Sequence, residues 1–262
     1  MSEMRTASFE GNEIDYLTFG RGEKNLVILP GLSVHSVMGL ADAVESSYSC
    51  FAEDYTVCLF DRTKHLGEGY TVIDAAEDTA SAMKSIGITE ADVFGVSQGG
   101  MIAIALASSH PEMIRKLILG STAAKPNSTS EKMLSLWLEK AQERDEEGLL
   151  SSFVDTVYSK NTLSLYRESL ISSNRGITEE EWERFVILTS ACSCDLTSDL
   201  GKIRCPVLVI GSEGDRVLTP DASREIASAL NCELYMYPSV YGHAVYDEAP
   251  DYRKRCLEFL RK

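Results

Sequence analysis

The chain has 262 residues, of which 44% are hydrophobic and 25% charged, a composition typical of a globular protein with a sizeable core. Its formal net charge of −15 opposes binding to nucleic-acid phosphates, so we expect no nucleic-acid partner. No apolar run reaches the roughly 18 residues of a membrane span. The N-terminus lacks the basic start and apolar stretch of a secretory signal, which predicts a cytoplasmic protein.

Neither the acidic residues nor the cysteines indicate a binding or metal site. Much of the acid lies in residues 139–148 and 178–185, and such runs are typical of helix faces that contact water. The seven cysteines are odd in number and are predicted to be reduced thiols. Cys192 and Cys194 lack the spacing of a zinc site, so no metal is expected.

Residues 1–121 and 197–262 alternate between strand and helix patterns. Residues 5–20 alternate in polarity and predict an antiparallel hairpin. The apolar runs that follow predict strands buried on both faces, as in a parallel sheet, at residues 25–31, 55–62, 91–97, 115–121, 205–215 and 232–238. Helix patterns fall between them, at residues 71–88, 98–114, 219–231 and 249–262. This alternation predicts an α/β fold with a mostly parallel central sheet.

The alternation stops between residues 122 and 196. Helix patterns follow one another here without a buried strand, at residues 130–144, 147–159, 161–174 and 178–193. We interpret residues 122–196 as a helical cap over one end of the sheet. Residues 1–121 and 197–262 are then expected to form the core.

Ser97 lies in the pattern Gly95-Val96-Ser97-Gln98-Gly99, directly after a predicted strand and before a predicted helix. G-x-S-x-G is common by chance, and only this strand–turn–helix setting makes it a candidate nucleophile turn. A sharp turn of this kind holds the serine in a strained conformation at a helix N-terminus, where the helix dipole favours a developing anion. Gly95 and Gly99 are expected because side chains there would meet neighbouring backbone.

A serine hydroxyl needs a base, and the sequence offers four histidines. His110 lies near the far end of the helix after Ser97, which favours a structural role. His35 and His65 follow strands and could line a pocket, although plain loop positions are the simpler interpretation. His243 follows the last predicted strand, at the edge where α/β sheets place their sites, and is the candidate base.

The base needs a carboxylate to orient it, and Asp215 follows a buried strand at the same edge of the sheet. Glu213 is the main rival. Asp247 and Glu248 are too near His243 in sequence for an obvious inward pose. The resulting chain order, Ser97, Asp215 and His243, is that of the α/β-hydrolase fold.

The whole chain resembles the α/β-hydrolase superfamily, in particular its small capped members: enol-lactonases, carbon–carbon bond hydrolases, carboxylesterases and cofactor-free haloperoxidases. The matching stretches are VILPGLS, FDRTKH, VFGVSQGGMIAIALASSHPEMIRKLIL, CPVLVIGSEGDRVLTP and YGHAVYDEAPDYRKRCLEFL. The resemblance implies a Ser97–His243–Asp215 triad, with backbone N–H groups of Leu32 and Gln98 as the oxyanion hole and no metal or organic cofactor.

The resemblance has departures. Many relatives carry His-Gly where this chain has Pro30-Gly31, and the loop after Asp61 has lost glycines that flank a histidine in relatives, which puts any role of His65 in doubt. Relatives that act on epoxides or haloalkanes carry an aspartate nucleophile, so Ser97 argues against those reactions.

The expected activity is hydrolysis of an ester or related acyl bond in a small to medium, neutral or apolar substrate, by a monomer or homodimer. The alternatives are carbon–carbon bond hydrolysis of diketone-type compounds, acyl transfer or perhydrolysis, and a weakly catalytic ligand-binding protein. Cap aromatic residues could line the substrate pocket, although plain cap core is the alternative for each: Trp137, Phe153, Tyr158 and Trp182.

Overall fold

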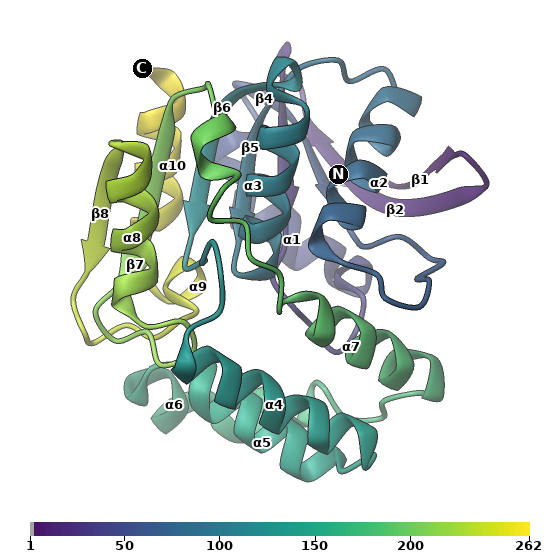
Figure 1. Ribbon diagram of the computed structural model, residues 1–262, viewed down its shortest axis with the longest axis vertical. Coiled ribbons are helices and arrows are strands. Elements are labelled where there is room, and N and C mark those ends of the chain that lie inside the picture. Colours follow the sequence, from purple (N-terminus) through teal and green to yellow (C-terminus); the bar gives the residue numbers. More distant parts are fainter. Residues whose placement is uncertain (1–2) are drawn as a thin grey trace.

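The computed structural model describes residues 3–262 and is built around an eight-stranded sheet (Figure 1). The spatial order is β1-β2-β4-β3-β5-β6-β7-β8, and β2 is antiparallel to both of its neighbours while the other pairs are parallel. The strands are β1 Glu3–Phe9, β2 Asn12–Gly20, β3 Lys24–Leu29, β4 Tyr55–Phe60, β5 Ala91–Val96, β6 Ile114–Gly120, β7 Val207–Ser212 and β8 Glu233–Tyr237.

Helices cover both faces of the sheet. One apolar cluster packs α2 (Val72–Ser85), α3 (Gln98–Ser109) and α8 (Pro220–Leu230) against one face. A second cluster packs α1 (Ala41–Tyr48), α9 (Val245–Glu248) and α10 (Tyr252–Arg261) against the other. Strands β3 to β7 are therefore buried on both sides, which is why they are apolar without alternation.

The sequence-based prediction of the sheet is confirmed with one difference, at β8. β8 was expected to be buried on both faces but is the edge strand of the described sheet, where fewer neighbouring side chains cover it, and its first residues are exposed. Residues 37–51 were not predicted as helical, yet they form α1 between short 3₁₀ turns at Val37–Leu40 and Ser49–Phe51. The helix is only eight residues long, ADAVESSY, and buries only Tyr48, so the sequence offers few large apolar residues that would mark it.

The helical insertion consists of α4 (Ser128–Gln142), α5 (Glu146–Val157), α6 (Lys160–Ser172) and α7 (Glu179–Ala191), between β6 and β7. Each helix begins after a polar capping residue: Asn127, Asp145, Ser159 and Thr178. The helices lie across the end of the sheet where the parallel strands finish (Figure 1). They fall within the predicted cap at 122–196, whose limits stay a prediction.

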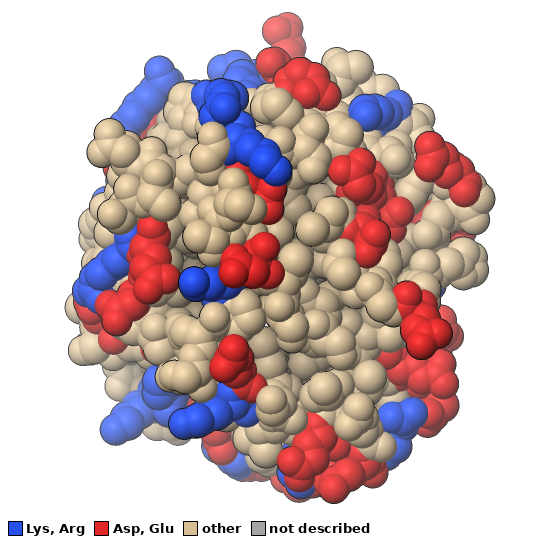
Figure 2. Space-filling view, in the orientation of Figure 1, with Lys and Arg blue, Asp and Glu red and all other residues tan. Residues whose placement is uncertain are grey.

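The cap has an apolar core of its own, in which Trp137, Leu149 and Phe185 are buried. That core continues onto the sheet domain through Val34, Val217 and Ala244, so the cap and the sheet share one packed interface. The acidic runs face water as predicted, and Figure 2 shows acidic side chains along the edge of the molecule where the cap helices lie. Within residues 3–262, no helix is long and apolar enough to cross a membrane.

Candidate active site

Ser97 occupies a strained turn between β5 and α3. Its backbone has φ 51° and ψ −123°, a region that non-glycine residues rarely adopt. The turn is tight because backbone comes close on both sides. A Cβ on Gly95 would lie 2.4 Å from the Gly99 carbonyl oxygen, and one on Gly99 would lie 2.0 Å from that of Leu29. The two glycines therefore have the steric role that the sequence predicted.

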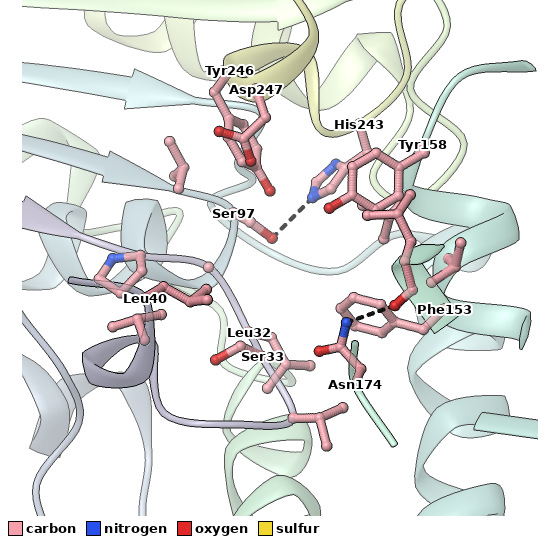
Figure 3. A pocket seen from close by; sticks show the side chains of 18 of the residues that line it. Leu32, Ser33, Leu40, Ser97, Phe153, Tyr158, Asn174, His243, Tyr246 and Asp247 are labelled. Carbon is pink, nitrogen blue, oxygen red and sulfur yellow. Dashed lines mark hydrogen bonds between the residues drawn. The ribbon is translucent and has the colours of Figure 1, made fainter. Parts of the chain in front are cut away.

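Three predicted residues meet at the carboxyl edge of the sheet, and Figure 3 shows two of them, Ser97 and His243. His243 Nε2 lies 3.0 Å from Ser97 Oγ, and His243 Nδ1 lies 2.9 Å from Asp215 Oδ2. Both His243 and Asp215 are buried, whereas Ser97 and His243 reach the cavity beneath the cap. A nucleophile, a base and an orienting carboxylate within hydrogen-bond reach are the geometry that serine-dependent acyl transfer needs.

The Asp215 carboxylate is held in place by backbone as well as by His243. Its Oδ1 accepts hydrogen bonds from the N–H groups of Val217 (2.8 Å) and Leu218 (3.0 Å). Burial by itself would raise the pKa of Asp215, but the charge and hydrogen bond of His243 and the two N–H groups outweigh it and lower the pKa. The rival acid, Glu213, instead forms an ion pair with Arg224 at the surface.

The loop that carries His243 is fastened to the cap. Glu248 accepts hydrogen bonds from the backbone N–H of Gly242 (2.6 Å) and of Ser159, the residue that caps α6 (2.7 Å). The N–H of Ala244 donates to the Val157 carbonyl at the end of α5 (3.0 Å). The position of His243 therefore depends on the corner between α5 and α6.

The two predicted oxyanion donors lie on either side of Ser97. Gln98 is the first residue of α3, so its N–H has no intrahelical acceptor. Leu32 follows Gly31, whose Cβ, if it had one, would lie 3.1 Å from Ser97 Cβ, and Leu32 itself lines the cavity. These positions are compatible with the predicted oxyanion hole, which stays a prediction.

The Gln98 side chain is a feature that the sequence did not reveal. It is buried and donates to the Leu188 carbonyl on α7 (2.5 Å), while its oxygen accepts from Arg62 (3.3 Å). Arg62 in turn donates to the Pro30 carbonyl (2.5 Å), two residues before Leu32. Burial lowers the pKa of Arg62 to about 10, against the opposing charge of Asp61. This buried network joins the nucleophile turn, the Leu32 loop and cap helix α7.

The other histidines lie away from the reacting groups. His35 bridges the loop after β3 to the cap, with Nδ1 2.7 Å from a Glu181 oxygen and Nε2 3.0 Å from the Asn174 carbonyl. His65 is exposed, and His110 pairs with Glu77 at the surface, as expected. None of the three lines the cavity at Ser97.

The cavity above Ser97 has a volume of about 430 Å³. Of the four predicted aromatic residues, Trp137, Phe153 and Tyr158 line it, whereas Trp182 does not. Trp182 is buried in the cap core, where the Arg144 guanidinium lies over its ring (5.9 Å to the centroid). Trp182 was predicted on the same basis as the other three residues, but its position on α7 directs the side chain away from the cavity.

Part of the cavity wall was not predicted at all. It comes from the 37–51 segment and from the residues around α9 and α10, and its lining residues are Val37, Leu40, Ala43, Val44, Ser47, Tyr48, Tyr246, Asp247 and Arg253. Sequence reasoning set Asp247 aside because it lies so close to His243. The structure agrees that Asp247 does not contact His243, but it shows the Asp247 side chain at the cavity (Figure 3).

Residues 24–250 match the family model described as alpha/beta hydrolase fold. The chain belongs to this family. It is 26% identical over 208 residues to "Putative carbamate hydrolase RutD" of Caulobacter sp. (strain K31), with 74% of each chain covered. It is 28% identical over 191 residues to 2-hydroxy-6-oxononadienedioate/2-hydroxy-6-oxononatrienedioate hydrolase of Burkholderia vietnamiensis (strain G4 / LMG 22486), covering 70% of this chain and 66% of the relative.

A solved structure supports the family assignment at the level of the fold. The enol-lactonase of Burkholderia xenovorans LB400 superimposes with a TM-score of 0.85 at 20% identity, covering 98% of this chain and 100% of that one. The names of these α/β-hydrolase relatives refer to carbamate, dioate and lactone substrates. Membership of the α/β-hydrolase family therefore establishes the fold and favours a hydrolase, but it leaves the substrate to be argued from the site.

Proposed function

We propose that this protein is a serine hydrolase that cleaves an ester or related acyl bond through Ser97, His243 and Asp215. The observation that carries the proposal is the hydrogen-bonded chain from Ser97 Oγ to His243 Nε2 (3.0 Å) and from His243 Nδ1 to Asp215 (2.9 Å), at the floor of a cavity. The aromatic and aliphatic residues of the cap that line this cavity favour small to medium substrates with an apolar portion.

In the first half of the proposed reaction, His243 Nε2 takes the proton of Ser97 Oγ while that oxygen attacks the substrate carbonyl carbon. The carbonyl oxygen becomes an oxyanion, which the N–H groups of Leu32 and Gln98 stabilise, a contribution of roughly 3 kcal/mol per donor in well-studied enzymes. His243 then gives the proton to the leaving oxygen. An acyl group remains on Ser97.

In the second half, His243 takes a proton from water, and the water oxygen attacks the acyl group. Collapse of the second oxyanion returns the proton to Ser97 and releases the acid. Asp215 holds the His243 ring so that Nδ1 carries a proton and Nε2 is free to accept one, and it stabilises the imidazolium cation. These steps require no metal or organic cofactor.

Hydrolysis of p-nitrophenyl esters from acetate to dodecanoate tests this proposal. Ser97→Ala removes the nucleophile and should lower kcat by about 10⁴-fold or more, and Asp215→Asn should lower it by a similar factor because the ring loses its tautomer. Ser85→Ala is the matched control, since Ser85 lies at the end of α2 and does not line the cavity.

Three outcomes are informative. If wild type hydrolyses these esters and folded Ser97→Ala does not, the proposal stands. The preferred acyl chain length then indicates the length of the cavity. Full activity of Ser97→Ala would contradict the mechanism. If wild type hydrolyses no ester, then ester hydrolysis is wrong, and diketone substrates and ligand binding without turnover become the assays of choice.

A further inference from the structure

The cavity has two unlike walls, with the Ser97 hydroxyl between them. On the cap side the lining is mostly apolar, with Trp137, Phe153 and Leu150 as its largest side chains, and the polar residues there, Tyr158, Ser173 and Asn174, are uncharged. On the opposite side, the segment after His243 brings Asp247 and Arg253 to the cavity. Figure 3 shows Ser97 between Phe153 on one side and Asp247 on the other. A substrate held at Ser97 therefore extends from a mostly apolar, uncharged wall toward one that carries charge.

Asp247 and Arg253 form an ion pair, with 2.7 Å between Asp247 Oδ1 and Arg253 Nη2. The two partners are not equally accessible. The Arg253 guanidinium stacks on the Tyr48 ring (4.6 Å to the centroid), and its side chain is 17% exposed. The Asp247 side chain is 49% exposed, and this accessible surface borders the cavity. The carboxylate is therefore the more accessible partner of the pair.

The chemistry of the remaining lining strengthens this polarity. Among the described residues that line the cavity, Arg253 is the only lysine or arginine, and Asp247 already engages it. A substrate carboxylate here would face a like charge with no free cation to offset it.

We propose that Asp247 is a specificity-determining residue. It selects substrates whose end remote from the cap carries an N–H or O–H donor, an ammonium group above all, and it rejects substrates that carry a carboxylate there. This inference rests on the proposed acyl-bond hydrolysis at Ser97. It defines the substrate class as acyl compounds with one apolar end and one hydrogen-bond-donating end.

The test uses two sets of esters that differ only in the terminal group. In one set the group is on the alcohol: 5-aminopentyl, hexyl and 5-carboxypentyl butyrate. In the other it is on the acid: methyl 6-aminohexanoate, methyl heptanoate and monomethyl pimelate. kcat/KM is measured for each ester by titration of released acid at pH 7.5. Two sets are needed because either the alcohol half or the acid half of the substrate could lie against Asp247, and only the corresponding set will respond.

In wild type, kcat/KM in one of the two sets should fall from the ammonium ester to the methyl ester to the carboxylate ester. The variants show how much of this order is due to Asp247. Asp247→Asn keeps the shape and an acceptor for Arg253 but removes the negative charge. It should lower the ammonium-to-carboxylate ratio of kcat/KM by about tenfold or more, since a full charge is lost at close range. Asp247→Asn with Arg253→Gln removes both charges and should give an intermediate ratio, an ordering that a merely structural role would not produce.

Glu23→Gln is the matched control, because it makes the same change in net charge at the opposite end of β3 from the site. It should leave the ratio unchanged. If Asp247→Asn does not fold, the double variant alone should still lower the ratio. A ratio within twofold of wild type in both variants, with hexyl butyrate or methyl heptanoate still hydrolysed, would overturn the inference and leave the proposed function intact. If no ester is hydrolysed in a Ser97-dependent way, both proposals fail together.

Discussion

The sheet side of the cavity is fixed by backbone geometry, whereas the cap side is fixed by side-chain packing. Ser97 sits in a strained turn with carbonyl oxygens against both flanking glycines, and backbone N–H groups hold Asp215. On the cap side, Trp137 and Phe153 are placed by contact with each other (4.7 Å between ring centroids) and with neighbouring apolar residues.

This difference has a consequence for substitutions. A turn that tolerates no additional atom responds to change in an all-or-none way, because a displaced backbone moves every group attached to it. A packed aromatic cluster responds by degrees, because neighbouring side chains relax into part of the lost volume. The following predictions test this contrast, from the largest expected effect to the smallest.

Gly99→Ala should have the largest effect. Its Cβ would lie 2.0 Å from the Leu29 carbonyl oxygen and 2.4 Å from that of Pro30, in the strand and loop that lead to Leu32. We expect a loss of at least about 3 kcal/mol in the free energy of unfolding and no measurable hydrolysis. Denaturant unfolding and ester assays check this. Gly201→Ala, where a Cβ would meet nothing within 4 Å, is the control and should be near neutral.

Trp182→Ala and Phe153→Ala should separate cap stability from substrate fit. Trp182 is buried away from the cavity, so its loss should cost about 3–5 kcal/mol in unfolding free energy without changing the preferred ester chain length. Phe153 lines the cavity, so its truncation should shift the preference toward longer chains. A shifted preference in folded Trp182→Ala would show that the contrast between the two residues is wrong.

Gln98→Met tests the contact between the sheet side and the cap side of the cavity. The backbone N–H of residue 98 is kept, but the Leu188 carbonyl loses its donor and buried Arg62 loses an acceptor. We expect a loss of about 1–3 kcal/mol in unfolding free energy and a rise in KM larger than the fall in kcat. Gln142→Met, at the exposed end of α4, should change neither value. A fall in kcat alone would contradict a role in holding the cap.

Glu181→Gln should have the smallest effect. Burial would raise the pKa of Glu181, but the hydrogen bonds from His35 and Thr178 outweigh it and lower the pKa. Because the folded-state pKa is depressed, this stability is present above the ordinary value of about 4.3 and is lost as pH falls through the lower folded value. The pair is partly exposed, so we expect less than about 1 kcal/mol at pH 7. Unfolding curves at pH 7 and pH 3 should differ less for Glu181→Gln than for wild type.

Most of the sheet could be predicted because strands β3 to β7 are largely buried on both faces and are therefore mostly apolar. Ser97, Asp215 and His243 could be named because each follows a strand, so topology alone brings them to one edge. Trp182 and Asp247 could not be assigned in this way. The direction of a cap side chain depends on how helices pack, and the helix in the 37–51 segment that completes the cavity is short and buries only Tyr48.

The fastening of the His243 loop also limits how this chain can be recombined. Glu248 holds Gly242 and Ser159 at once, and a Cβ on Gly242 would lie 2.7 Å from the Ser159 nitrogen. A cap transplanted from a relative would have to bring an α5–α6 corner of the same shape, or the base would shift with it. The cap is therefore not a detachable module, and a chimera should keep residues 157–159 together with residues 242–248 from one parent.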